Sequence, residues 1–271
     1  MIVPMMRHLI SQPIYLVVSN YLSVMNMTAH HPVGSFDFHA CKGKEWKLIL
    51  KEWLNLLKLM KNPKSFYLSL FLKEVLQNRL IEEDDPEIQS RVLDCLLNWK
   101  DDYFLPYAKH LRNLISYELT REELTTWSLS RESKMVEECH RAYLVPLVIR
   151  LLMPKVRKLR GLASRKKASI CLRKAILSFI AGLDITELPL FFALLINPLQ
   201  IVEKTDGPAN LFWTLPIGCT SEFQASSLLE YFTLDNIASL SWKKKYGFLH
   251  VIEDIVGVFD ELHIRPFLDL L

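Results

Sequence analysis

Apolar residues recur along this chain at the spacing of one face of an α-helix. Counted from Trp46, they fall at positions i, i+3, i+4, i+7, i+8 and i+11 of the segment 46–57, and similar spacing recurs in 88–99, 168–179 and 248–259. Because side chains three and four residues apart share one side of a helix, each segment predicts an amphipathic helix with one apolar stripe. Alternation of apolar and polar residues, which would predict strands, is almost absent.

Boundary residues agree with the helical spacing. Asp85 is placed to cap a helix that has Pro86 at its first position, and Thr120 with Glu123 forms a capping-box pattern. The predicted helices are 44–61, 64–81, 86–100, 105–117, 121–131, 136–160 with a break near Pro154, 165–182, 187–197, 222–232, 241–259 and 261–271.

The spacing of these units indicates a helical-repeat protein. The steps from Trp46 to Ile88 and then to Thr120 have the size of HEAT or armadillo repeats. A helix hairpin with one apolar stripe cannot close a core alone, so neighbouring hairpins stack to bury it. We therefore predict an all-α fold, a HEAT/armadillo-like helical-repeat superhelix or α-solenoid. The expected organisation is a poorly defined segment 1–43, a repeat region 44–197, a Pro- and Gly-containing loop 198–220, and continuing repeats 221–271.

Positive charge is concentrated in one segment. The chain has 33 Lys and Arg against 30 Asp and Glu, but residues 154–175 contain no acidic residue. Helical geometry, with an apolar stripe centred between Cys171 and Leu172, places Lys166 and Arg173 on the opposite side. We expect an exposed positive ridge, and its candidate binding residues are Lys155, Arg157, Lys158, Arg160, Arg165, Lys166, Lys167, Arg173 and Lys174.

This ridge has three interpretations. It contacts RNA or an acidic partner, where neutralising phosphates would give salt-sensitive affinity. Alternatively it is a nuclear localisation signal, which needs only clustered, exposed Lys and Arg. The third interpretation is a solvated helix face without a ligand. The residues alone leave these alternatives open.

Catalytic and metal-binding motifs are missing from the sequence. Neither GxGxxG, GxxxxGK[ST], GxSxG nor HExxH occurs. His30, His31, His39 and Cys41 lack a second ligand pair at metal-site spacing. We therefore expect no enzyme, metal, cofactor or small-molecule substrate.

The sequence also disfavours a disulfide-bonded protein and a membrane protein. Five cysteines without a CxxC pair predict reduced thiols of an intracellular protein, most of them in the core. The apolar segment 1–27 is interrupted by Arg7, His8 and Pro13, so we expect no membrane association. The acidic run 81–87 is expected to suit the positive end of a helix rather than to bind a cation.

Several stretches resemble a known family. They are SRVLDCLLNWKDDYFLPYAKHLRNLI, REELTTWSLSRES, LVPLVIRLLMPKVRKLRGLASRKKAS, ELPLFFALLINPL and YGFLHVIEDIVGVFDELHIRPFLDLL. In that order they are similar to the U3 small nucleolar RNA-associated protein 20, or down-regulated-in-metastasis, family. The resemblance covers roughly 44–271, apart from the loop 198–220.

The resemblance implies a HEAT-repeat scaffold of the small-subunit processome in the nucleus and nucleolus. Its implied partners are processome proteins and, for direct RNA contact, pre-rRNA or U3 RNA. It carries no catalytic motif to transfer. Because family members are much longer and this chain ends within a predicted helix, we expect an internal fragment or truncated product. The alternative function is a generic helical-repeat adaptor that binds proteins without touching RNA.

Overall fold

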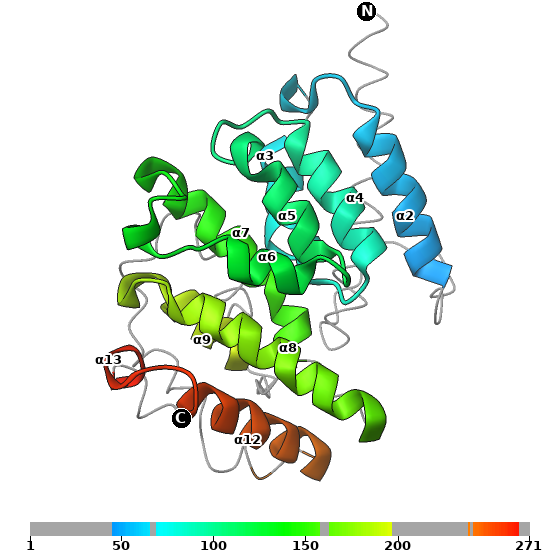
Figure 1. Cartoon of the computed structure of the whole chain (residues 1–271). Coiled ribbons are helices and arrows are strands. Elements are labelled where there is room, and N and C mark those ends of the chain that lie inside the picture. The colour runs from blue at the N-terminus through cyan, green and yellow to red at the C-terminus, as the bar shows by residue number, and fades with distance from the viewer. Residues whose placement is uncertain (1–44, 66–68, 158–162, 197–237, 239–240, 266–271) are drawn as a thin grey trace, which may run out of the picture. The chain divides into compact units, whose positions relative to one another are not determined.

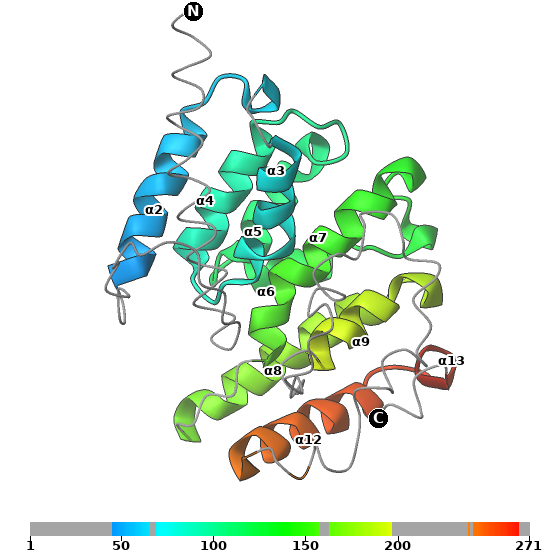
Figure 2. The ribbon, with the colours of Figure 1, turned by 180° about the vertical axis from the view of Figure 1, so that it is seen from behind.

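The computed structural model describes residues 45–65, 69–157, 163–196, 238 and 241–265 (Figures 1 and 2). Within these ranges the chain is helical and contains no strand, which confirms the all-α prediction. The chain divides into two compact units, Met1–Asp101 and Asp102–Leu271. The superhelical stacking and the boundaries predicted for the repeat region stay predictions.

The first unit is built around a pair of helices. Helix α2 (Glu45–Lys58) packs against α4 (Pro86–Leu97). Leu50, Leu54 and Leu57 of α2 are buried, as are Ile88, Val92, Cys95 and Leu96 of α4. Helix α3 (Ser69–Asn78) contacts α4 and the 3₁₀ turn η2 (Leu80–Glu82), while η1 (Pro63–Ser65) precedes it. The core of this unit therefore lies between the apolar stripes that the spacing predicts.

Charged contacts hold the same pair in register. Lys51 lies 3.2 Å from Asp85, and Lys58 lies 2.7 Å from Asp94. Asp85 also caps α4, because its Oδ1 accepts hydrogen bonds from the backbone amides of Glu87 at 3.0 Å and Ile88 at 3.4 Å. The predicted cap is confirmed, and it serves both the helix and its neighbour.

The second unit contains the longest helices. Helices α5 (Ala108–Ile115) and α6 (Thr120–Thr126) form a hairpin after η3 (Leu105–Tyr107). Helix α7 (Glu138–Arg157), which follows η4 (Arg131–Ser133), packs against α5, α8 and α9. Helix α8 (Ala163–Ala181) also contacts α6 and α12 (Trp242–Val256), and Figures 1 and 2 show α8 and α12 side by side.

Three shorter elements complete this unit. They are η5 (Ile185–Glu187), α9 (Pro189–Ile196) and α13 (Glu261–Ile264). The residues 191–195 of α9 are all buried, as its continuous apolar sequence predicts. The predicted helix 222–232 and the loop 198–220 lie outside the described residues. No described helix has the length and apolar character needed to cross a bilayer.

Several predicted helix boundaries are wrong; α6, for example, ends at Thr126 rather than at residue 131. Helix α7 continues through Pro154 to Arg157 instead of breaking there. Proline removes one backbone hydrogen bond, but its fixed φ is compatible with a helix. Thr120 is not a cap, since Leu119 occupies that position. The Thr120 hydroxyl instead donates to the Leu114 carbonyl at 3.1 Å and contacts the Ser116 carbonyl. It thereby ties α6 to the end of α5.

Candidate functional site

Lys155, the first residue of the predicted ridge, is buried. Its ammonium group donates to the carbonyl of Ile115 at 3.2 Å, to the hydroxyl of Thr120 at 3.0 Å and to the carbonyl of Leu114. Both carbonyls belong to the last turn of α5, where a helix has no backbone donors left for them and where its dipole favours a cation. Lys155 therefore closes the end of α5 from within α7.

Arg157 has a similar role at the end of another helix. It is half-buried, and its Nη2 donates to the carbonyl of Leu194 in the last turn of α9. This carbonyl too lacks a partner within its own helix. Two cations of the basic segment thus satisfy the carboxyl ends of neighbouring helices.

Arg173 is buried against a carboxylate of α12. Its Nε lies 2.6 Å and its Nη2 2.5 Å from Oδ2 of Asp254, and both side chains are less than a tenth exposed. Lys174 is exposed and its Nζ lies 3.7 Å from Oδ1 of the same carboxylate. One aspartate therefore receives two cations of the basic segment, and the pair with Arg173 joins α8 to α12.

The prediction that the basic segment forms an exposed ridge is wrong at Lys155 and Arg173, because both side chains are buried. The helical wheel placed Arg173 opposite the apolar stripe, but the buried side of α8 runs through Arg173, Ile176, Leu177 and Ile180. Cys171, near the predicted centre of the stripe, is exposed. Helix α8 contacts α6, α7 and α12, so three neighbouring helices determine which of its residues are buried.

The remaining members of the predicted site are less fully placed. Lys158 and Arg160 lie outside the described residues. Arg165, Lys166 and Lys167 belong to the first turns of α8, for which the backbone is described. Among the cations of the segment whose side chains are described, Lys174 is the exposed one. Whether these residues bind RNA or an acidic partner stays a prediction.

A second buried ion pair was missed by sequence reasoning. Arg141 of α7 binds Glu187 of η5 through two parallel hydrogen bonds, Nε to Oε1 at 2.8 Å and Nη2 to Oε2 at 2.6 Å. Burial works to lower the pKa of Arg141, but the bonds and charge of Glu187 outweigh it and raise the pKa. Asp184, whose side chain accepts from the Thr186 amide, completes a capping box with Glu187. A charged residue within an apolar helix is the sequence signal for such a pair.

Glu137, Cys139 and His140 gather at the start of α7. Their ligand atoms lie within 4.8 Å of one another. Tyr107 contacts His140 Nδ1 through its hydroxyl at 3.1 Å. The positive end of α7 opposes a divalent cation here, and Glu137 and Cys139 are exposed, so we assign no metal to this cluster. His30, His31, His39 and Cys41 lie outside the described residues.

The described cysteines divide into two kinds. Cys95 is buried, as predicted, and its thiol lies 3.3 Å from the carbonyl of Leu54. Burial raises its pKa to about 12, so the reactive thiolate is suppressed at neutral pH. Cys139 and Cys171 are exposed, so two of the three described cysteines depart from the expectation that most cysteines lie in the core.

The acidic run has the structural role expected for it. Burial works to raise the pKa of Asp85, but hydrogen bonds from Lys51 and the amides of Ile88 and Glu87 lower it below its ordinary value. Bonds from Lys51 and Arg91 lower the pKa of Glu87 in the same way. These carboxylates are engaged by cations and a helix end of the first unit.

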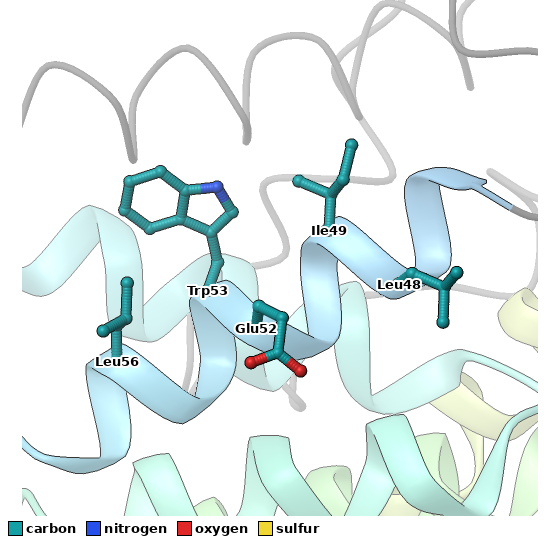
Figure 3. Close-up of a pocket in the computed structure, with 5 residues that line it drawn as sticks. All are labelled: Leu48, Ile49, Glu52, Trp53 and Leu56. Carbon is teal, nitrogen blue, oxygen red and sulfur yellow. The ribbon is translucent and has the colours of Figure 1, made fainter.

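Helix α2 carries an exposed apolar hollow, which we call the α2 groove. It is lined by Leu48, Ile49, Glu52, Trp53 and Leu56, is open to solvent and has a volume of about 410 Å³. Ile49, Trp53 and Leu56 project from the same side of the helix (Figure 3). Leu48 and Leu56 are 65% and 57% exposed, unlike the buried leucines on the face that packs against α4.

Comparison with known proteins gives matches to one family. The family model described as U3 small nucleolar RNA-associated protein 20, N-terminal, matches residues 44–271. The U3 small nucleolar RNA-associated protein 20 of Schizosaccharomyces pombe (strain 972 / ATCC 24843) is 26% identical over 174 residues. That alignment covers 64% of this chain and 6% of the relative. The chain therefore corresponds to a small part of the curated relative.

Proposed function

Because this chain belongs to the family of U3 small nucleolar RNA-associated protein 20, we propose that it serves as a non-catalytic scaffold in nucleolar ribosome biogenesis. In this role it joins the small-subunit processome, which processes pre-rRNA toward 18S rRNA. The observation that carries the proposal is the family match, which spans every described helix. The relative's name associates that protein with the U3 RNA, and the present chain would contribute one segment of such an association.

The architecture supports a positional role. Buried ion pairs and helix-end contacts of Lys155, Arg141 and Arg173 fix one helix against the next in the second unit. A rigid stack of helices presents partners with a fixed surface, and in helical-repeat proteins such surfaces bind extended partners. Catalytic chemistry is not part of the proposal.

We assign direct RNA contact to part of the basic segment. Lys155, Arg157 and Arg173 are engaged inside the second unit, so they are left out of the proposed surface. The proposed contacts are Lys158, Arg160, Arg165, Lys166, Lys167 and Lys174. These six cations would neutralise phosphates and release counterions, which makes the affinity fall steeply with salt.

A filter-binding titration with U3 RNA at two salt concentrations tests this contact. We expect Lys166→Glu with Lys167→Glu to weaken binding and to lower the salt slope by about one to two. The matched control is Lys61→Glu with Lys109→Glu, which changes the charge equally at two exposed lysines elsewhere. Equal affinities for the parent and the Lys166/Lys167 variant would remove RNA contact from the proposal.

The alternative function is an adaptor that binds only proteins. The observation that favours it is the α2 groove, because exposed apolar surfaces often mark protein contacts. An adaptor would show no RNA affinity above that of the Lys166/Lys167 variant at low salt, yet would still join processome proteins. RNA binding that disappears in the Lys166/Lys167 variant would exclude it.

Nuclear and nucleolar localisation is the third part of the proposal. Deleting 155–167 is a poor test, since it removes Lys155 and Arg157 from their helix-end contacts and damages the fold. Lys158→Gln with Arg160→Gln, Lys166→Gln and Lys167→Gln preserves these contacts. A fluorescent fusion of this variant should leave the nucleus if the segment is a localisation signal, and should stay there if it acts only on RNA.

A further inference from the structure

Helix α12 exposes one stripe of side chains along its length. The described side chains of this helix that are exposed share the spacing of one helix face, and they are Trp242, Tyr246, Leu249, Glu253 and Val256. Val251 and Ile255, on the opposite side, are buried. The stripe therefore faces away from the core of the second unit.

The chemistry of this stripe changes along the helix. Its first two turns are aromatic, since Trp242 is 75% and Tyr246 49% exposed. The two ring centroids lie 6.0 Å apart and the ring planes differ by 28°, so the rings are nearly parallel. The His250 ring packs on Tyr246 at a steep angle, with centroids 4.4 Å apart, and its Nδ1 lies 3.1 Å from the Glu253 carboxylate. Neighbouring groups thus hold the tyrosine in place, and the stripe becomes acidic only at Glu253.

Positive charge accompanies the aromatic turns. The three residues between the two rings are all lysines, Lys243 to Lys245, and residues 236–252 contain no Asp or Glu. Lys245 also donates to the carbonyl of Ala238 at 3.0 Å. The amino-terminal half of α12 therefore combines exposed rings with cations and lacks an acidic residue that would neutralise them.

The basic start of α8 lies at the same end of α12. The Arg173–Asp254 pair joins the two helices, which run in the same direction in Figures 1 and 2. Arg165 and Tyr246 each precede their member of this pair by eight residues, which is about 12 Å along a helix axis. The backbone therefore places the basic first turns of α8 level with the aromatic turns of α12.

We propose that this end of α12 binds single-stranded RNA, with one base stacked on Trp242 and one on Tyr246. Surfaces that bind single strands combine aromatic rings for the bases with cations for the backbone, and both are present here. A protein helix covering the whole stripe would leave these cations without a role, so the charge favours RNA. The inference rests on the RNA contact proposed for the basic segment, and it names single-stranded RNA as the target.

The test compares single-stranded and duplex RNA. The full chain is titrated by fluorescence anisotropy with a labelled 12-nucleotide oligouridylate, U12, and with the same strand paired to A12. Trp242→Leu with Tyr246→Leu should weaken U12 binding at least about tenfold, because stacking on both rings is lost. The salt slope should stay the same, since the phosphate contacts remain. Duplex affinity should not change, because paired bases are stacked inside the helix.

Two control variants separate stacking from other effects. Trp242→Phe with Tyr246→Phe keeps two rings and should retain most of the affinity for U12. Leu249→Ala changes a side chain of the same stripe that is 59% exposed, and it should leave U12 binding unchanged. The urea midpoint of the leucine pair should match that of the parent, because both rings are largely at the surface.

The outcomes distinguish this inference from the function on which it rests. If the parent binds U12 and the leucine pair binds it equally well, the stacking site is wrong and the stripe belongs to a protein partner. RNA contact would still stand in that case, provided that the Lys166/Lys167 variant loses affinity. A parent that binds neither RNA at low salt would overturn both proposals. A loss in Leu249→Ala as large as that of the leucine pair would also overturn stacking.

Discussion

The ion pair between Arg173 and Asp254 offers the sharpest test of the structure. Arg173→Met keeps most of the side chain's length and apolar stem but removes the guanidinium group. It leaves the Asp254 carboxylate in a place that is 7% exposed, with Lys174 Nζ at 3.7 Å as its remaining cation. The expected result is a large loss of stability in the second unit.

The size of that loss follows from the burial of both partners. Removing one member of a buried pair costs about 3–5 kcal/mol, because the other charge stays desolvated. Lys174 partly compensates Asp254, so we expect about 3 kcal/mol, at the lower end of that range. Lys174→Met, its exposed neighbour, should cost less than about 1 kcal/mol and serves as the matched control.

Urea unfolding followed by circular dichroism measures these free energies. Because the chain has two units, separate transitions are fitted where they resolve. A double-mutant cycle with Asp254→Leu isolates the pair, and Arg173→Met with Asp254→Leu should cost less than either single change. Added salt should change the loss little, since a buried pair is weakly screened.

Two outcomes would refute the reasoning. One is a cost below about 1 kcal/mol for Arg173→Met, which would mean that the carboxylate is solvated. The other is a double variant whose cost equals the sum of the single ones, which would mean that the two side chains do not interact. If Arg173→Met lost RNA affinity without losing stability, Arg173 would belong to the exposed basic surface after all.

Three further predictions concern single side chains. Lys155→Met should lower the unfolding free energy by about 1–3 kcal/mol, because it leaves carbonyls at the end of α5 unpaired; an unchanged urea midpoint would contradict this. The pKa of Asp85 is lowered in the folded chain, so its stabilisation is present at neutral pH and is lost as the pH falls through that value, below about 4. Asp85→Asn should therefore make the urea midpoint less sensitive to acid than the parent's, and parallel acid profiles would argue against the cap. Iodoacetamide at pH 7.5 should alkylate Cys139 and Cys171 long before Cys95, as peptide mass spectrometry can show; comparable rates would mean that Cys95 is accessible.

The helices of the first unit could be predicted because local signals agreed there. The stripe of 46–57 buries Leu50, Leu54 and Leu57, and Asp85 caps the helix that Pro86 begins. Each of these features depends on residues within a few positions of one another. Spacing and capping chemistry are local, so one sequence is enough to read them.

The facing of α8 could not be predicted, because its decisive partner is remote in the sequence. Ala168, Cys171 and Ala175 are small enough for either side of a helix, so the wheel had no firm anchor. The carboxylate that draws Arg173 inward lies 81 residues later. A charge run predicts solvent exposure only where no such partner or helix end competes for it.

The α2 groove shows a second feature that the spacing of apolar residues could not predict. Its residues Ile49 and Trp53 were counted in the apolar stripe of 46–57, which assumed one core-facing side. The structure divides that stripe between the face buried against α4 and the face that lines the groove. Periodicity shows that a side is apolar, but the number of neighbours that cover it depends on the packing of other elements.

The separation between Arg173 and Asp254 has a consequence during synthesis. Ribosomes add about 5–20 residues per second, so the aspartate follows the arginine by about 4–16 s. In that interval α8 lacks its contact with α12, and its Ile176 and Ile180, on the same side as the arginine, are buried in the folded chain. A nascent chain with such a delay is a natural client for chaperones that shield apolar surface.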